Sequence, residues 1–454
     1  MKRAEWPIAV RMVDVGQPLP ELSDVTAYPR TRVFVTDGDQ LLGSVDLWNA
    51  RRPISASRLR DAIAESLTDE LARWALARGL QQRGESDERP LATDVSVSVI
   101  VPTCDRPDAL RRCLASLSAQ RTRRPFEIVV VDNCPARGVA RAIAREFAAV
   151  TVIDESRPGL SYARNAGFAA ATGDILVATD DDVVAPPGWI EKLVRPFSRP
   201  DVMAVTGHVL PLELETESQC GFEAYGGLGK GFQRLEADGW WFHSFRGAVP
   251  TWRLGATANA AFRASIFEDP RIGLLDEALG AGTPTGCSED TLLFYRILKA
   301  GHVIVYEPNA YLWHCHRRTM ESLRNQIYGY SKGHVAYQVT TLLREGDRRA
   351  LVRLFWSLPR TYLQRMLERL RGYSDYPLSL IALEVRGSLA GPWALWQSRR
   401  RVRRLGRSVP YVARSRRGGP GSGAGKVEPA AGALGREQNH AVSLESPLTQ
   451  TPAS

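Results

Sequence analysis

The chain has 454 residues and a net charge of +9, with 44% hydrophobic and 24% charged residues. Such a composition is typical of a globular protein with two or three domains. The sequence contains no run of about 18 apolar residues, so we expect no membrane-spanning helix. The best candidate, residues 376–396, is interrupted by Glu384 and Arg386.

The cysteines are dispersed along the chain and form no CxxC pair: Cys104, Cys113, Cys134, Cys220, Cys287 and Cys315. This pattern predicts reduced thiols and argues against a disulfide framework or a zinc site. Residues 1–6 carry charges with no long apolar stretch behind them, which predicts no secretory signal. We therefore expect a cytoplasmic protein.

Residues 1–80 have the pattern of a small α+β accessory module. Apolar runs at 32–35 and 41–47 flank an Asp-Gly-Asp turn, which predicts a β-hairpin. A helix is predicted next, because apolar residues recur at spacings of three and four within 59–74. Residues 81–94 are polar and contain glycine and proline, as expected of a linker.

From residue 95 onward, apolar strands alternate with amphipathic helices. Strands and helices are predicted in turn at 95–101, 107–119, 127–131, 137–148, 150–153, 160–171 and 174–178. This alternation predicts an α/β domain over 95–317, with a mostly parallel sheet covered by helices on both faces. Ligands of such sheets bind outside the carboxyl ends of the strands.

Polar residues gather at these strand ends. Thr103 and Asp105 follow the first strand, and Asp132 follows the second. The fourth strand is followed by three consecutive aspartates, Asp180, Asp181 and Asp182. Three adjacent carboxylates cannot stay ionised in a buried strand without partners. A solvated acidic turn is one explanation, but acids at three strand exits favour a site for Mg²⁺ or Mn²⁺ and a diphosphate.

The rest of the chain divides into a helical part and a low-complexity part. Residues 318–412 are basic and carry an apolar face at helical spacing, which predicts either a core contact or a membrane contact. Nine arginines and no acid lie between Arg399 and Arg417, beside two tryptophans, and this favours an anionic membrane surface. Residues 413–454 are rich in glycine, serine, proline and alanine and are predicted to be a disordered tail.

A series of motifs runs through the α/β domain. They are Val-Ser-Val-Ile-Val-Pro-Thr at 97–103 with Asp-Arg-Pro at 105–107, Glu-Ile-Val-Val-Val-Asp-Asn at 127–133, Gly159 with Ala-Arg-Asn-Ala-Gly at 163–167, Gly-Asp at 173–174 with the three aspartates, Gly-Ala-Gly-Thr-Pro at 280–284, Ser-Glu-Asp-Thr at 288–291 and Trp-His-Cys-His-Arg at 313–317. In this order they resemble glycosyltransferase family 2 over about half of the chain.

The resemblance implies a GT-A fold and inverting transfer of a sugar from a nucleotide diphosphate sugar. Motif positions imply that the nucleotide sugar is bound by Pro102, Thr103, Asp105, Asp132, Arg164, Asp180 and Asp181. Asp180 and Asp182 match the outer positions of the family's metal motif, which implies Mg²⁺ or Mn²⁺. His316, or alternatively His314, is implied to complete the metal shell.

Direct inversion needs a base that takes the proton of the acceptor hydroxyl as the new bond forms. The resemblance places Asp290 in this role, with the adjacent Glu289 as the alternative. A metal that balances charge on the departing diphosphate makes a second catalytic carboxylate unnecessary. Favourable charge at a helix N-terminus is the non-catalytic explanation of this pair.

We therefore expect a metal-dependent glycosyltransferase with a glycan or lipid-linked acceptor, acting in cell-surface polysaccharide or glycolipid synthesis. A peripheral position on the inner membrane face would suit the basic C-terminal region. A sugar-phosphate nucleotidyltransferase is one alternative, but its glycine-rich basic loop is missing after the first strand. A non-catalytic nucleotide- or glycan-binding scaffold is another. No nucleic acid is expected as a partner, because the arginine run is short and peripheral.

Overall fold

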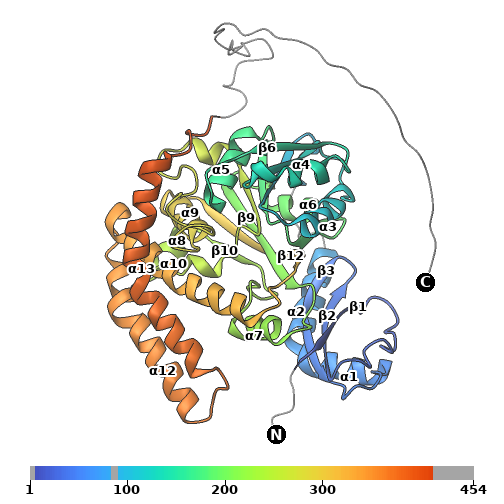
Figure 1. The fold of residues 1–454 in the computed structure, drawn as a ribbon. Coiled ribbons are helices and arrows are strands. Elements are labelled where there is room, and N and C mark those ends of the chain that lie inside the picture. Colours follow the sequence, from blue (N-terminus) through green and yellow to red (C-terminus); the bar gives the residue numbers. More distant parts are fainter. Residues whose placement is uncertain (1–5, 83–89, 413–454) are drawn as a thin grey trace, which may run out of the picture. The chain divides into compact units, whose positions relative to one another are not determined.

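In the computed structural model, described over residues 6–82 and 90–412, a nine-stranded sheet lies between two layers of helices (Figure 1). The strands follow the order β10-β12-β9-β11-β7-β4-β5-β6, and β8 pairs with β12. Their bounds are β4 Val97–Thr103, β5 Phe126–Asp132, β6 Val150–Asp154, β7 Ile175–Thr179, β8 Val183–Val184, β9 Val202–Pro211, β10 Leu235–Ala237, β11 Asn259–Arg263 and β12 Val303–His314.

The predicted alternation of strands and helices up to β7 is confirmed. The helices of this part of the chain are α3 Pro107–Ser118, α4 Val139–Ala144, α5 Leu160–Ala170, α6 Trp189–Val194, α7 Glu217–Tyr225, α8 Gly239–His243 and α9 Glu289–Lys299, with short 3₁₀ turns at Pro135–Arg137, Arg195–Ser198, Thr251–Arg253 and Ala264–Glu268. Helix α4 starts later than predicted, because Gly138 at φ 64° separates it from the turn at Pro135–Arg137, and it also ends before the predicted end, at Ala144.

Strands β7, β4, β5 and β6 are parallel, as predicted, and pair in register so that Thr103 lies beside Asp132. The other half of the sheet mixes directions. Strand β11 is antiparallel to both β7 and β9, whereas β12 is parallel to β9. The carboxyl ends of β4, β5 and β7 therefore share one edge of the sheet.

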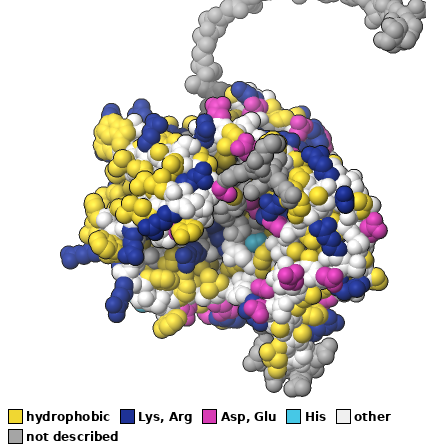
Figure 2. All heavy atoms as spheres, turned by 90° about the horizontal axis from the view of Figure 1, so that it is seen from below, with side chains coloured by type: hydrophobic (Ala, Val, Ile, Leu, Met, Phe, Trp, Pro, Cys, Tyr) yellow, Lys and Arg dark blue, Asp and Glu magenta, His cyan; other side chains and the backbone are white. Residues whose placement is uncertain are grey.

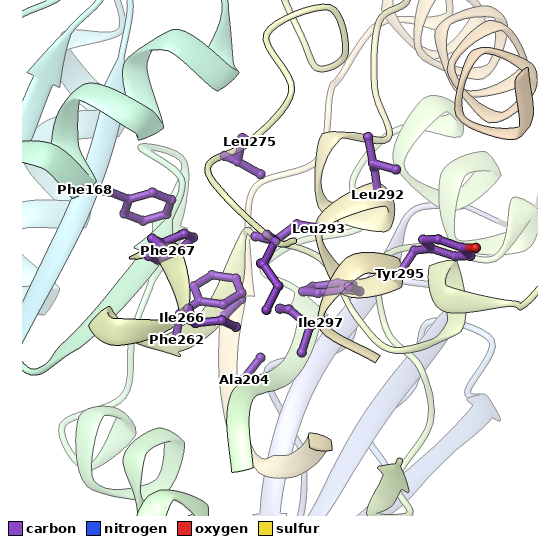
Figure 3. Close-up of a cluster of buried hydrophobic side chains, with 14 of the residues drawn as sticks. Phe168, Ala204, Phe262, Ile266, Phe267, Leu275, Leu292, Leu293, Tyr295 and Ile297 are labelled. Atoms are coloured by element: carbon purple, nitrogen blue, oxygen red, sulfur yellow. The ribbon is translucent and has the colours of Figure 1, made fainter. Parts of the chain in front are cut away.

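Two hydrophobic clusters hold the helices on opposite faces of this sheet. Successive strand residues point to opposite faces, so Leu176 packs into the cluster that contains Phe168 of α5 and Leu293 of α9 (Figure 3). Its neighbour Val177 packs into the other cluster, with Leu114 of α3. Burial on both faces explains why these strands read as continuous apolar runs.

The N-terminal module is a three-stranded sheet with two helices. Its elements are β1 Ile8–Asp14, β2 Arg30–Asp37, β3 Gln40–Trp48, α1 Ala56–Ser66 and α2 Thr68–Gln82. The predicted hairpin is confirmed as antiparallel β2 and β3, whereas the predicted single helix is split at Leu67. Strand β1, which pairs in parallel with β2, was not predicted. Residues 83–89 of the predicted linker lie outside the described residues.

The C-terminal region is helical and consists of α10 Met320–Glu345, α11 Arg349–Val352, a π-helical turn Arg353–Ser357, α12 Leu358–Leu370 and α13 Leu378–Leu405. Two glycines allow helix α13 to lie close against α10. A Cβ atom at Gly387 would lie 2.8 Å from Ser331, and one at Gly391 would lie 2.6 Å from Val335. No helix among the described residues is long and apolar enough to cross a membrane. The predicted tail, 413–454, lies outside the described residues.

After α13 the chain returns to the start of α5. The Tyr162 hydroxyl donates to the carbonyl oxygen of Gly406 at 2.7 Å, and Arg157 donates to that of Arg407 at 3.2 Å. Arg401 of α13 donates to the carbonyl oxygen of Pro158. The end of α13 and the residues after it therefore support the loop that leads into α5.

Candidate functional site

A cavity of about 680 Å³ opens at the edge of the sheet where β4 and β7 end. Besides the strand ends, it is lined by the first residues of α5, by the start of α9 and by one face of α10. This is the position predicted from the α/β pattern. The predicted residues that line it are Pro102, Thr103, Arg164, Asp180, Asp181, Asp182, Glu289, Asp290, His314 and His316.

The three aspartates have different surroundings. Asp180 pairs with the buried Arg164, whose Nη2 lies 2.6 Å from its Oδ1. Asp181 accepts a hydrogen bond from the Thr103 hydroxyl at 2.7 Å and one from Arg106 at 3.1 Å. Burial raises the pKa of Asp181 to about 6, although the Arg106 charge acts in the opposite direction. Asp181 therefore ties the end of β7 to the end of β4.

Asp180, Asp182 and His314 form a group with the geometry of a metal site. One possible ligand atom from each residue lies within 4.8 Å of the other two. Asp182 Oδ1 is buried and accepts no well-formed hydrogen bond from the described residues, although His314 Nε2 lies 3.2 Å away. Two carboxylates and an imidazole with an oxygen left unsatisfied fit a divalent cation such as Mn²⁺ or Mg²⁺.

Strand pairing explains how His314 reaches these aspartates. In the short antiparallel ladder between β8 and β12, His314 is the partner of Val183. Burial opposes ionisation of Asp182, but the adjacent His314 and Arg106 charges hold the pKa of its carboxyl well below the ordinary value. The sheet thus brings together groups that are more than 130 residues apart in the sequence.

The structure favours His314 over the predicted His316 as the third ligand. The Nδ1 atom of His316 lies 2.9 Å from Nδ1 of His314, and its Nε2 lies 2.9 Å from Oε1 of Glu223 in α7. Both ring nitrogens of His316 are thereby occupied by protein groups. Only His314 has a nitrogen, Nε2, that faces the aspartates.

Glu289 and Asp290 begin α9, after Ser288 at φ 79°. Glu289 is buried, and its Oε1 accepts a hydrogen bond from Arg164 at 2.9 Å. Burial, together with the Asp290 charge, raises the pKa of Glu289 to about 7 against the effect of Arg164. Asp290 is half-buried. Its Oδ1 accepts from the Thr291 backbone at 2.6 Å, whereas among the described residues its Oδ2 has only a long contact of 3.4 Å with the Thr257 backbone.

Two residues predicted to bind the nucleotide sugar, Asp105 and Asp132, are not among those that line the cavity. The exposed Asp105 has φ 57° and pairs with Arg137. Asp132 Oδ1 accepts from the backbone of Cys134 at 2.9 Å, while its Oδ2 is buried with no partner among the described residues.

The prediction that all cysteines are reduced is wrong for Cys104 and Cys134, which form a disulfide with their Cα atoms 5.1 Å apart. These residues follow the ends of β4 and β5, and parallel pairing in register places the two ends side by side. Both cysteines line the cavity. The cysteines that remain free are Cys113, Cys220, Cys287 and Cys315.

Arg106 is a site residue that sequence reasoning did not assign. Its Nη1 lies 3.1 Å from Asp181 Oδ1 and 2.8 Å from Asp182 Oδ2. The signal was present in the Asp-Arg-Pro motif directly after the first strand. Glu223 was also missed, because it lies in a region of the sequence without a recognised motif.

Comparison with known proteins gives a family for this part of the chain. Residues 98–219 match the family model described as glycosyl transferase family 2. The chain carries a glycosyl transferase family 2 domain. Together with the parallel strands and the helices on both faces of the sheet, this match confirms the predicted GT-A fold class for the family 2 domain.

Curated relatives of the family 2 domain are also named as transferases. The chain is 29% identical over 326 residues to the pre-mycofactocin glycosyltransferase of Mycobacterium tuberculosis, which covers 70% of this chain. It spans 64% of that relative's length. It is 35% identical over 123 residues to the glucosyl-dolichyl phosphate glucuronosyltransferase of Haloferax volcanii, covering 26% of this chain and 38% of that protein.

Among solved structures, the chain is similar to the mannosyltransferase PcManGT from Pyrobaculum calidifontis in complex with GDP-Man and Mn²⁺. Their identity is 19% and the TM-score 0.42, over 75% of this chain and 84% of that chain. It is also similar to TarS of S. aureus, at 17% identity and a TM-score of 0.37, over 55% of this chain and 40% of that chain.

Proposed function

We propose that this chain is a metal-dependent inverting glycosyltransferase that moves a sugar from a nucleotide diphosphate sugar to an acceptor hydroxyl. The observation that supports the proposal is that Asp180, Asp182 and His314, which could hold a divalent cation, share one cavity with Asp290. This cavity lies at the sheet edge of a family 2 domain. The names of the two curated relatives, both glycosyl-transferring enzymes, support the same reaction class.

Asp290 is the better candidate for the base. Its Oδ2 has only the long contact to Thr257 and remains able to accept the proton of an incoming hydroxyl. Glu289 is held by Arg164 on one oxygen, so its role is to fix that guanidinium beside Asp180. A bound divalent cation would neutralise charge on the departing diphosphate, so no protonated residue is needed there.

The remaining residues of the site are proposed to position the donor. Arg164 is buried, and its Nε has no partner among the described residues. Its positively charged guanidinium lies beside Asp180, close enough to the proposed metal site to attract a diphosphate. Pro102 and Thr103, at the end of β4, line the wall of the cavity and are proposed to contact the nucleoside. Asp132 is not among the residues that line the cavity, so it would contact the base only after local rearrangement.

Donor hydrolysis tests the proposal. The full chain is incubated with UDP-, GDP- and dTDP-sugars and Mn²⁺ or Mg²⁺, and the release of nucleoside diphosphate is measured. Turnover of one donor class that is lost in Asp182→Ala and in Asp290→Asn supports the transferase. Asp108→Asn, a change at an exposed residue of α3, is the matched control and should retain activity.

The same experiment separates the alternatives. A nucleotidyltransferase would instead consume a nucleoside triphosphate and a sugar phosphate and release pyrophosphate. Metal-dependent nucleotide binding with no turnover of any donor, even with candidate acceptors added, would favour the binding scaffold.

The acceptor is proposed to be a glycan or lipid-linked molecule at an anionic membrane surface, as in cell-surface polysaccharide or glycolipid synthesis. Helices α12 and α13 and the π-helical turn before them expose large apolar side chains, among them Phe355, Trp356, Leu363, Leu370, Leu389 and Trp393. Phe355 is 76% exposed and Leu389 78% exposed. We call this group the hairpin patch.

Charge at the hairpin patch favours lipid as its partner. Figure 2 shows hydrophobic side chains gathered over the side of the molecule formed by α12 and α13, with Lys and Arg side chains among them. Exposed arginines near the patch include Arg360, Arg371, Arg386 and Arg400. An apolar surface bordered by arginine suits the interface of an anionic bilayer, and a peripheral position on the inner membrane face would follow.

A further inference from the structure

A series of side chains in contact connects the N-terminal module to the proposed metal site of Asp180, Asp182 and His314. Its first member is Arg32 of β2, whose Nη1 lies 2.8 Å from Oε2 of Glu223 in α7. The same guanidinium donates from Nε and Nη2 to the two oxygens of Asp46, at 2.8 and 2.9 Å. With three of its nitrogens engaged, Arg32 holds a fixed direction toward Glu223.

Glu223 contacts the first of two histidines through its other oxygen. Its Oε1 lies 2.9 Å from Nε2 of His316, and Nδ1 of His316 lies 2.9 Å from Nδ1 of His314. The ring of Phe222 packs edge-on against His316 with ring centroids 4.8 Å apart, which closes one side of this path. His316 is 2% exposed, so water does not compete for its nitrogens.

The hydrogen-bond partners indicate which ring nitrogens of His316 and His314 carry a proton. A carboxylate only accepts, so His316 donates from Nε2 to Glu223 and its neutral Nδ1 accepts. When His314 is neutral, as it must be to bind a cation, it donates from Nδ1 to His316, and this leaves a lone pair on its Nε2. This atom is the one that faces Asp182. A metal-binding imidazole needs its ligand nitrogen unprotonated and its other nitrogen held by a hydrogen bond.

We propose that the N-terminal module orients the metal site: Arg32, through Glu223 and His316, keeps His314 in the tautomer that binds a divalent cation. The inference rests on the metal site of the proposed function. Without Arg32, the half-buried Glu223 carboxylate would lose its cationic partner and turn toward solvent, and its hydrogen bond to His316 would weaken. Arg32, Glu223 and His316 are positioning residues, because none of them lies in the cation-binding group.

Direct measurement of Mn²⁺ binding to the full chain, by the electron paramagnetic resonance of free Mn²⁺, tests the proposal without any sugar donor. We expect Arg32→Ala and Glu223→Ala to raise the dissociation constant about tenfold or more, the range seen for outer-shell groups of metal sites. Arg32→Lys, which keeps the charge, should restore part of the affinity. Circular dichroism shows whether each variant is folded.

Two variants of the same module serve as controls. Arg30→Ala removes a cation beside Asp46 without touching Glu223, and Tyr28→Phe removes a 2.7 Å hydrogen bond from the module to Glu215. Both should bind Mn²⁺ as the unmodified chain does. Unchanged affinity in folded Arg32→Ala and Glu223→Ala would overturn the inference alone. Absence of Mn²⁺ binding by the unmodified chain would overturn the metal-dependent function and this inference with it.

Discussion

Arg164 and Glu289 form a buried ion pair, with Nη1 of the arginine 2.9 Å from Oε1 of the glutamate. The other terminal nitrogen of Arg164 lies 2.6 Å from Asp180, so one guanidinium connects the start of α9 to the metal group. Both members of the pair are less than a tenth exposed. Arg164 therefore compensates the buried Glu289 carboxylate, which solvent does not reach, and also the partly exposed carboxylate of Asp180.

Replacing Arg164 should destabilise the protein strongly. In Arg164→Met, Glu289 and Asp180 lose their cation, and a buried charge without a partner costs about 3–5 kcal/mol. The free energy of unfolding in urea measures this loss. Arg141→Met removes the exposed ion pair to Asp154 and should cost less than about 1 kcal/mol. Equal effects of the two changes would contradict a buried, structural role for Arg164.

Removal of the Cys104–Cys134 disulfide should lower stability. The bond closes a loop with a sequence separation of 30, for which chain entropy predicts on the order of 3 kcal/mol. The double change Cys104→Ala and Cys134→Ala is compared with Cys315→Ala, which alters a free cysteine. Urea midpoints measured with and without a reductant provide the check. An unmodified chain that does not respond to the reductant would show that the bond does not form.

Stability should fall as the pH drops below about 6.5, in part because of His208. Burial lowers the pKa of His208 to about 4. The unfolded chain takes up a proton near pH 6.5 whereas the folded chain does not, so stability is lost as the pH falls through this window. His208→Gln should remove about 2 kcal/mol of the difference in stability between pH 7 and pH 5. His243→Gln, at an exposed position, is the control, and an unchanged pH slope in His208→Gln would refute the assignment.

The hairpin patch should mediate the binding of the protein to anionic vesicles. At low salt, we expect the protein to float with vesicles containing phosphatidylglycerol and to bind less to neutral ones, because arginines border the apolar side chains. The double change Phe355→Asp and Leu389→Asp should abolish flotation. Leu76→Asp alters an exposed leucine of the N-terminal module and should leave it unchanged. Flotation that survives in the patch variant would place the lipid contact elsewhere.

The parallel half of the sheet and its strand ends followed from sequence patterns. Strands buried on both faces are continuous apolar runs, and helices repeat with their own period, so the positions of β4 to β7 could be predicted from the residues alone. The aspartates after β7 indicated the site for a separate reason, because adjacent charges at the end of an apolar run need a compensating group.

The parts that could not be predicted depend on pairings distant in sequence. His314 reaches Asp182 through the β8–β12 ladder, and nothing local distinguishes it from His316 two residues later. The disulfide likewise depends on the register between β4 and β5, which places Cys104 beside Cys134. Strand β1 was missed because its alternation is weak: three consecutive residues, 10–12, are only partly buried.

The contacts that residues after α13 make with the loop before α5 determine the shortest fragment of the protein that could bind a sugar donor. The family model ends at residue 219, yet the loop before α5 is supported by hydrogen bonds to Gly406 and Arg407. A version cut after β12 would keep every proposed ligand and still lose the support behind Arg164. We therefore expect the end of α13 and the residues after it to stabilise the proposed site, and their removal should impair that site even though it leaves every proposed ligand in place.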